Sequence, residues 1–264
     1  MRISRFYVDK SNIKIGETIN LNQEDINHIR TVLRLKKGDN VEIFNDTEEY
    51  LAELSLVSTK KVTARILKSN TNNINTKQIF SINLFQSLIK PIKLDELVRI
   101  HTELGTSNFY PIQTEFSIIK KENIQNRINR WQKILVSAAK QSSRIGLMNL
   151  HSPIDFKESI SIAKNTSDIV IFLEVKNKLA IHKIDITLNL LNKIIEYKKN
   201  KKKNKELVIS VFIGPEAGFS KTEINLAIEH KFDFCCLSNN ILRSETASIA
   251  IITLLKFIEL QCIV

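Results

Sequence analysis

The chain has 264 residues, 43% of them apolar and 25% charged, which is the composition of an ordinary soluble protein with one large or two smaller domains. Lysine and arginine total 39 against 28 acidic residues, and the formal net charge of +11 favours a polyanionic partner such as nucleic acid. Lys, Asn and Ile are abundant throughout, so an AT-rich genome explains part of this charge.

Targeting, membrane and metal-binding features are missing from the sequence. The first ten residues, MRISRFYVDK, lack the apolar core of a signal peptide. The apolar stretch Ala247–Leu255 is too short to span a bilayer, which needs about 20 residues. The three cysteines, Cys235, Cys236 and Cys262, have neither zinc-ligand spacing nor a disulfide pattern. We therefore expect a cytoplasmic protein with reduced thiols and no metal.

Residues 1–70 are typical of a small β-barrel. Segments rich in β-forming residues are separated by turn signals such as Lys37-Gly38-Asp39, and one amphipathic helix, about Gln23 to Leu33, interrupts them. The polar, aperiodic residues 71–77 predict a linker. The expected strands are Ile13–Ile19, Asn40–Phe44, Tyr50–Leu56 and Lys61–Leu67.

From residue 78 to 264, apolar runs alternate with helical patterns. This alternation predicts an α/β domain whose mostly parallel sheet is covered by helices on both faces, with ligands beyond the carboxyl ends of the strands. The expected strands are Ile79–Leu84, Phe109–Ile112, Ile169–Leu173, Leu207–Ile213 and Phe232–Leu237. The expected helices are Leu94–Leu104, Ile124–Ser142, Leu188–Tyr197, Thr222–His230 and Thr246–Ile258.

Most of the positive excess lies beyond residue 70. The helix expected over Ile124–Ser142 keeps its positive charges among few acids, which favours contacts with phosphate groups. The run Lys198–Lys205 is more typical of a solvated loop, with phosphate attraction as the alternative. The basic residues of the helix and its end are Arg127, Arg130, Lys133, Lys140 and Arg144.

A strand–loop–helix motif runs through residues 208–223. Gly214-Pro215 turns the chain after a buried strand, and Gly218 allows a positive φ or a close backbone approach. Ser220 and Glu223 predict a capping box at the next helix. The loop has neither the GKS or GKT of a phosphate loop nor GxGxxG. An ordinary strand-to-helix turn is therefore the alternative to a binding loop.

A second motif, at residues 237–247, presents Arg243 and Glu245 between a buried strand and an apolar helix. Charged residues are costly in such a place unless they are used or paired. Two interpretations stay open. Arg243 could act in chemistry, or Arg243 and Glu245 could form a structural ion pair with Ser244 as the helix cap.

Two weaker motifs lie on helices. Thr102–Gly105 ends one helix, with Gly105 as a natural residue just past its end. Gln141 and Arg144 are three residues apart and share a helix face. An RNA contact and a surface ion pair explain Arg144 equally well.

Together, these motifs resemble one family, the ribosomal-RNA small-subunit methyltransferases that place a methyl group on uridine N3, within the knotted SPOUT class. The resemblance covers nearly the whole chain, and the joint spacing is specific although each piece alone is not. The matching positions are His28, Val32–Arg34, Lys37–Asp39, Lys93, Glu103–Gly105, Pro111, Trp131, Gln141-Ser142, Arg144, Ile213–Gly218 and Ile241–Ala247.

The resemblance implies a trefoil-knotted SPOUT methyltransferase domain over residues 78–264, preceded by a PUA-like β-barrel over residues 1–70. It also implies a homodimer with each cofactor pocket near the subunit interface. The implied cofactor is S-adenosyl-L-methionine, held by the loops that follow three strands. The residues implied to bind it are Leu173, Glu174, Ile213, Gly214, Pro215, Glu216, Gly218, Leu237, Ser238, Ile241 and Leu242.

The implied reaction is methylation of uridine N3 in small-subunit (16S) ribosomal RNA, in an assembled particle. The imide nitrogen must lose its proton, and a nearby arginine could stabilise the charge that develops on the base oxygens. The implied catalytic residues are Arg243, Glu245, Glu103 and Arg144. The expected RNA contacts are Arg2, Arg5, Arg30, Arg34, Arg127, Arg130 and Gln141.

Two alternatives stay open: a non-catalytic rRNA-binding protein, or a SPOUT methyltransferase that acts on another RNA position. The chain also departs from the family's usual residues. Phe116 stands where an arginine is usual and removes one cation from the expected RNA surface, while Ala217 replaces a glycine of the loop. The other departures are His101, Met148, Ser238 and Asp46–Glu49.

Overall fold

The computed structural model describes residues 3–70, 79–174, 192, 194 and 206–261. Contacts divide the chain into two compact units, residues 1–77 with 136–147, and residues 78–135 with 148–264. Arg2, the expected linker, most of the helix expected over Leu188–Tyr197, the Lys198–Lys205 run and Cys262 lie outside the described residues. Within the described part of the chain, no helix is long and apolar enough to cross a membrane.

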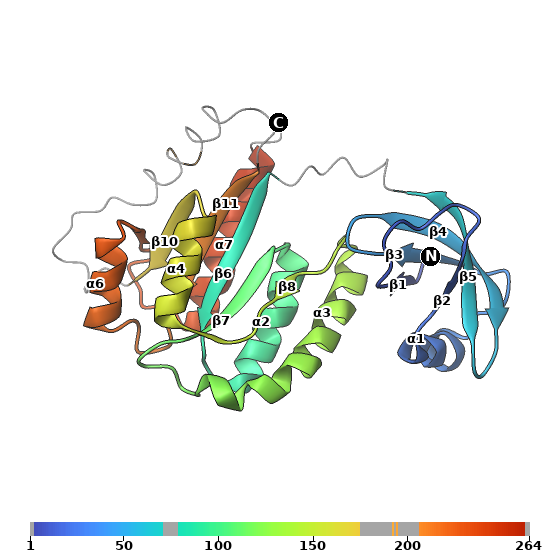
Figure 1. The fold of residues 1–264 in the computed structure, drawn as a ribbon, viewed down its shortest axis with the longest axis horizontal. Coiled ribbons are helices and arrows are strands. Elements are labelled where there is room, and N and C mark those ends of the chain that lie inside the picture. Colours follow the sequence, from blue (N-terminus) through green and yellow to red (C-terminus); the bar gives the residue numbers. More distant parts are fainter. Residues whose placement is uncertain (1–2, 71–78, 175–191, 193, 195–205, 262–264) are drawn as a thin grey trace. The chain divides into compact units, whose positions relative to one another are not determined.

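The first unit contains a five-stranded open sheet in the order β1-β3-β4-β5-β2 (Figure 1). β1 pairs with β3 in parallel, and the other neighbours pair antiparallel. Its inward side chains, among them Val41, Ile43 and Leu54, are fully buried and form the core of this unit. The strands are β1 (Arg5–Tyr7), β2 (Thr18–Asn20), β3 (Asn40–Phe44), β4 (Glu49–Val57) and β5 (Val62–Ser69).

The strand expectations are confirmed for β3, β4 and β5, and only in part for Ile13–Ile19. The chain turns at Lys14–Glu17, where the Glu17 amide donates to the Lys14 carbonyl at 3.1 Å and Gly16 has a φ of +84°. Only the end of that segment therefore joins the sheet. The expected helix is present as α1 (Gln23–Asn27), followed by a π-helical segment, His28–Leu33.

The second unit contains a seven-stranded sheet in the order β12-β10-β11-β6-β7-β8, with β9 also paired to β7. Every pairing between its described strands is parallel, as expected. The strands are β6 (Phe80–Ser87), β7 (Asn108–Gln113), β8 (Asn149–Leu150), β9 (Ile154–Asp155), β10 (Ile169–Leu173), β11 (Leu207–Ile213) and β12 (Asp233–Cys235).

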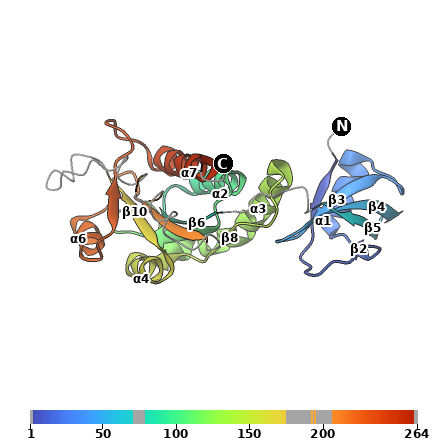
Figure 2. The same cartoon turned by 90° about the horizontal axis from the view of Figure 1, so that it is seen from above.

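Helices cover both faces of this sheet, as predicted (Figure 2). The helices α2 (Pro91–Leu104) and α7 (Ser244–Gln261) lie together on one face. The helices α4 (Phe156–Thr166) and α6 (Lys221–Glu229) lie on the other, where Phe156 packs against the rings of Phe172 and Phe212. Gly105 ends α2 with a φ of +82°, which confirms its predicted place past the helix end.

The helix α3 (Ile128–Ser142) contributes to both units, with the boundary between Leu135 and Val136. Two short 3-10 turns, Lys121–Asn123 and Gln125–Arg127, precede it. In its first part, Trp131 donates to Asp95 of α2 at 2.8 Å. In its second part, the Lys140 ammonium contacts Asp25 of α1 at 2.6 Å. Each part of the helix is therefore fixed to its own unit by an aspartate, half-buried in the case of Asp95 and buried in the case of Asp25.

Candidate functional site

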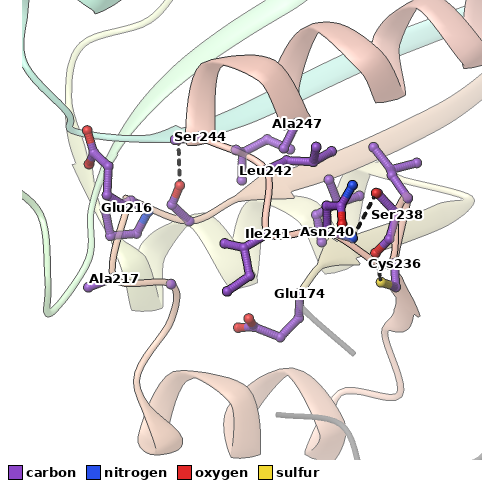
Figure 3. A pocket seen from close by; sticks show the side chains of 16 residues that line it. Glu174, Glu216, Ala217, Cys236, Ser238, Asn240, Ile241, Leu242, Ser244 and Ala247 are labelled. Atoms are coloured by element: carbon purple, nitrogen blue, oxygen red, sulfur yellow. Dashed lines mark hydrogen bonds between the residues drawn. The ribbon is translucent and has the colours of Figure 1, made fainter. Parts of the chain in front are cut away.

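A pocket lies at the carboxyl ends of three neighbouring strands, β10, β11 and β12, where α7 begins (Figure 3). It encloses about 200 Å³. Ile241 and Glu174 extend into the space between the loops (Figure 3). The lining residues are Leu173, Glu174, Ile213, Gly214, Pro215, Glu216, Ala217, Gly218, Cys236, Leu237, Ser238, Asn240, Ile241, Leu242, Ser244 and Ala247. Every residue expected to bind a cofactor is in this set.

The loop after β11 is folded tightly by its glycines. Gly218 has a φ of +75°, and its amide donates to the Pro215 carbonyl at 2.9 Å. A Cβ on Gly214 would come within 3.2 Å of the ring of Phe219, which is fully buried beneath the loop. A side chain at 214 would therefore press on the Phe219 ring, and glycine is favoured at 218 by conformation. The loop passes directly into α6, where Ser220 and Glu223 form the predicted capping box.

The loop after β12 is short and internally bonded. The Asn240 amide donates to Ser238 Oγ at 3.0 Å, and Cys236 Sγ donates to the Ser238 carbonyl at 3.1 Å. Burial raises the pKa of the Cys235 thiol to about 12, so that this residue stays a protonated apolar side chain. In the part of the chain that the structure describes, no cluster of His, Cys, Asp or Glu could hold a metal ion.

A buried polar chain connects this pocket to β6. Gln86 Nε2 donates to Ser244 Oγ at 3.0 Å, and Ser244 Oγ donates to the Gly214 carbonyl at 2.6 Å. Gln86 is fully buried, and Ser244 is 4% exposed. The first residue of α7 is thereby fixed to the glycine loop, and Gln86 fixes Ser244. The sequence expectations missed Gln86, although a polar pair, Gln86-Ser87, ending an apolar strand was a usable signal.

Arg243 and Glu245 do not form the ion pair that was one of the two interpretations. The Lys93 ammonium of α2 lies 3.5 Å from a Glu245 carboxylate oxygen instead. Arg243 is exposed beside the pocket-lining residues Leu242 and Ser244, and its side chain makes no ion pair within the described residues. Lys93 can form this ion pair with Glu245 because α2 and α7 pack side by side. The arginine is thus left open at the rim of the pocket.

Glu103 lies away from this pocket within one chain. It is near the carboxyl end of α2, and α2 runs back from the carboxyl edge of the sheet toward the amino edge. Its carboxylate accepts from Arg99 at 2.9 Å on the helix surface. Close to it, the buried His101 joins α2 to α7 through Ser248 Oγ at 2.8 Å, and burial lowers the His101 pKa to about 3. This end of α2 is built for helix packing.

Arg5 has a structural position in the first unit, which corrects its expected RNA contact. Its side chain is 3% exposed. Its Nη2 donates to the Glu49 carboxylate at 2.5 Å, and its Nε lies 3.2 Å from a Glu42 carboxylate oxygen in an ion pair. It also donates to the Ala139 carbonyl at 3.0 Å, and its guanidinium lies 4.4 Å from the Phe44 ring centre. A guanidinium with these partners has no donor directed to solvent, so β1 uses it to hold the end of α3.

The other expected RNA residues have mixed surroundings. Arg34 and Gln141 are exposed, and Arg30 is half-buried. Arg127 and Arg130 both contact the carboxylate of Asp95, at 3.0 and 2.9 Å, so part of their charge is neutralised. Arg144 belongs to the first unit, where burial lowers its pKa to about 10 and leaves it protonated at neutral pH.

Comparison with known proteins identifies the family. The sequence-family model of the RNA methyltransferase domain matches residues 75–256 of this chain. The chain belongs to the RNA methyltransferase family. A family model of the RNA methyltransferase PUA domain matches residues 21–67, which confirms the expected PUA-like fold, with its curled sheet open as a half-barrel. The predicted enzyme class and α/β fold are confirmed with it.

Relatives of this RNA methyltransferase match almost its whole length. A ribosomal RNA small subunit methyltransferase E of Buchnera aphidicola is 28% identical over 97% of this chain and 93% of its own. One of Aquifex aeolicus is 28% identical over 91% of this chain and 94% of its own. A structure from Legionella pneumophila, described as a complex with the bound cofactor SAM, is 25% identical, with a TM-score of 0.79 and coverage of 97% and 98%.

A second solved structure supports the same fold. The ribosomal RNA small subunit methyltransferase E of Neisseria gonorrhoeae, bound to S-adenosyl methionine, has a TM-score of 0.77 and 23% identity, covering 97% of this chain and 98% of its own. The likeness in fold therefore extends over nearly the whole chain.

Proposed function

We propose that this RNA methyltransferase uses S-adenosylmethionine to methylate uridine N3 in small-subunit ribosomal RNA. The observation that carries the proposal is the pocket between the three strand-end loops at the carboxyl edge of the sheet. The relatives that are ribosomal RNA small subunit methyltransferases support ribosomal RNA as the substrate, and two similar structures with bound S-adenosylmethionine support the cofactor.

The residues present fit this cofactor. The walls are largely apolar, from Leu173, Ile213 and Leu242, which suits an adenine ring. Gly214 lets the loop pack closely on Phe219, and Gly218 allows its tight turn. The peptide groups of the loop would form hydrogen bonds with the polar edge of the adenine. When bound there, S-adenosylmethionine would supply an electrophilic methyl group on its sulfonium sulfur. The proposal needs no metal.

The protein's part in the reaction is alignment and charge stabilisation. The uridine imide nitrogen must lose a proton before it can attack. Arg243, exposed at the pocket rim, would stabilise the negative charge that then spreads over the base oxygens. Glu245 would keep α7 fixed to α2 through Lys93, and Gln86 would act as a positioning residue through Ser244. Arg34 and Gln141 would bind RNA from the first unit.

The same proposal includes a homodimer, a trefoil knot in the methyltransferase domain, and an assembled small-subunit particle as the substrate. On α7, Phe257 and Leu260 are each 59% exposed and lie three residues apart, so they share one apolar helix face. A second copy of the chain would cover them. We expect a homodimer by light scattering, and Phe257→Asp with Leu260→Asp to give a monomer. An assembled small-subunit particle would be preferred to free RNA as substrate.

Two measurements test the proposal. Calorimetry should detect binding of S-adenosylmethionine by the wild-type protein and none by Gly218→Val, since a branched side chain is strained at a φ of +75° and would crowd the loop. Mass spectrometry of rRNA from a deletion strain should show the loss of one N3-methyluridine. If the protein binds the cofactor but rRNA from the deletion strain keeps all its N3-methyluridine, the protein is a methyltransferase that acts on another RNA position. Binding of rRNA without the cofactor would leave a non-catalytic rRNA-binding protein.

A further inference from the structure

A four-residue turn, Thr114–Ser117, follows β7 at the carboxyl edge of the sheet and presents an aromatic ring to solvent. Phe116 is 44% exposed at the third position of this turn, and Ile118 just beyond it is 46% exposed. The backbone closes normally, with the Ser117 amide donating to the Thr114 carbonyl at 3.2 Å. The Phe116 ring gains little from burial within the fold, so its face is available to a partner.

The turn is held rigidly. Ser117 Oγ accepts from the Thr114 amide at 2.9 Å, and the Ile118 amide donates to the Leu88 carbonyl at 3.0 Å, where β6 ends. The Glu115 amide donates to the buried Glu223 carboxylate at 2.8 Å. Phe116 therefore has a fixed backbone, and a partner that binds its ring need not order a loop.

The same Glu223 carboxylate connects the turn to the pocket. Its other oxygen accepts from the Ser220 amide at 2.9 Å, and Ser220 directly follows the Gly214–Phe219 segment. Thr222 also donates to the Glu115 carboxylate at 3.2 Å. One buried side chain thus separates the turn from the loop that lines the pocket, and both lie at the edge of the sheet where the methyl donor is proposed to bind.

Two exposed lysines lie close to this turn along the chain, and Glu115 of the turn itself is held by Thr222. Lys90, two residues after the Leu88 contact, and Lys120, two residues after Ile118, are both exposed. Neither forms an ion pair within the described residues. An exposed aromatic ring among lysines is the combination that binds single-stranded nucleic acid, in which bases stack on rings and phosphates lie on cations.

We propose that Phe116 stacks on a base of the RNA substrate beside the target nucleotide, with Lys90 and Lys120 on the adjoining phosphates. This rests on the proposed function, because it needs an RNA strand entering the methyl-donor pocket. It makes Phe116 a positioning residue for the substrate and gives it no contact with the cofactor.

The test uses full-length protein and small-subunit particles from the deletion strain, with the rate of methyl transfer measured against particle concentration. Phe116→Ala should raise KM for the particle by about fivefold or more, the usual effect of losing one base–aromatic contact. Phe116→Trp should keep the wild-type KM. Phe116→Arg should bind with a steeper salt dependence, because a cation on phosphate replaces a stack. Ile228→Ala is the matched control, because it shortens another large apolar side chain, 40% exposed on α6, that has no proposed contact with RNA or with a second copy of the chain.

Cofactor affinity by calorimetry and mass by light scattering are read on every variant, and both should equal the wild-type values for Phe116→Ala. A KM within twofold of wild type in Phe116→Ala, or an equal loss in Phe116→Trp, overturns the stacking contact. A change of mass in Phe116→Ala overturns it as well, and makes the turn an interface between copies of this chain. Absence of cofactor binding and methyl transfer in the wild type refutes the proposed function itself, and the inference with it.

Discussion

Two arginines that adjoin short apolar segments differ in burial: Arg5 is buried, whereas Arg243 is exposed. Arg5 of β1 is buried, with two carboxylates, a carbonyl and an aromatic ring around it. Arg243, at the start of α7, is exposed beside the pocket and has no ion pair within the described residues. The Arg5 guanidinium is enclosed and charge-paired by the fold, whereas the Arg243 guanidinium is accessible to a ligand.

The difference shows what separates structural from functional charge here. A buried arginine must be paired, because an unpaired buried charge is very costly, and pairing removes it from chemistry. An exposed arginine at a pocket rim adds little to stability and is free to bind a developing anion. Substitutions at four positions, Arg5, Arg243, His101 and Lys93, test this difference, and they follow in order of expected effect.

Arg5→Ala should give the largest loss of stability. It leaves Glu49 buried without its cation, and removing one partner of such a pair typically costs about 3 kcal/mol or more. The free energy of unfolding in urea, followed by circular dichroism, measures this. Arg65→Ala, which removes an exposed arginine from β5 of the same sheet, should change it by less than about 0.5 kcal/mol. Equal losses in the two variants would refute the structural role of Arg5.

Arg243→Ala should have the opposite signature. We expect turnover to fall by about 100-fold, as for the loss of one charge-stabilising donor, with nearly unchanged thermal stability and cofactor affinity. Arg243→Lys keeps the charge without the planar fork, so it separates a point charge from a bidentate contact. Methyl transfer by Arg243→Ala at the wild-type rate would make Arg243 an ordinary surface residue.

His101 is a second buried ionisable side chain, and its effect on stability should appear as a dependence of the free energy of unfolding on pH. Burial lowers its pKa to about 3 in the folded protein, against an ordinary value of about 6.5 in the unfolded chain. Between these values only the unfolded state binds the proton, so stability falls as the pH falls below about 6.5. From pH 7 to pH 5 the wild type should lose about 2 kcal/mol more than His101→Gln in urea unfolding. Parallel pH profiles for the two proteins would show that His101 titrates normally.

Lys93→Met should have the smallest effect. Its contact with Glu245 spans 3.5 Å, and the Lys93 side chain is 38% exposed, so the stability change should stay below about 1 kcal/mol. If Lys93 acts only through Glu245, turnover in Lys93→Met, in Glu245→Gln and in the double variant should be similar. Additive losses would give each residue a contact of its own.

The sequence predicted those parts of the fold that carry a local signal. Continuous apolar runs predicted β10 and β11, and Gly105 predicted the end of α2. It missed β1, β8 and β9, which are two or three residues long, because so short a strand has no period. It also missed α4, where the residues FKESISIAKNT show only a weak apolar stripe.

The candidate site divides in the same way. The pocket loops were predictable because glycine, proline and serine follow buried strands. The partners of polar side chains were not, because these depend on residues far apart in the sequence: Gln86 and Ser244 are separated by 158 residues, and Arg5 and Ala139 by 134. The pairing of Glu245 with Lys93 rather than its neighbour Arg243 has the same cause.

The contact between Trp131 and Asp95 gives the protein an internal optical reporter. Trp131 is the only tryptophan of the chain, fully buried, with its indole N–H on the Asp95 carboxylate at 2.8 Å. Tryptophan fluorescence therefore arises from one place, where α3 meets α2. A shift of that emission to longer wavelength at lower urea than the loss of circular dichroism would show this junction opening before the rest of the chain. Coincident transitions would show one cooperative unfolding.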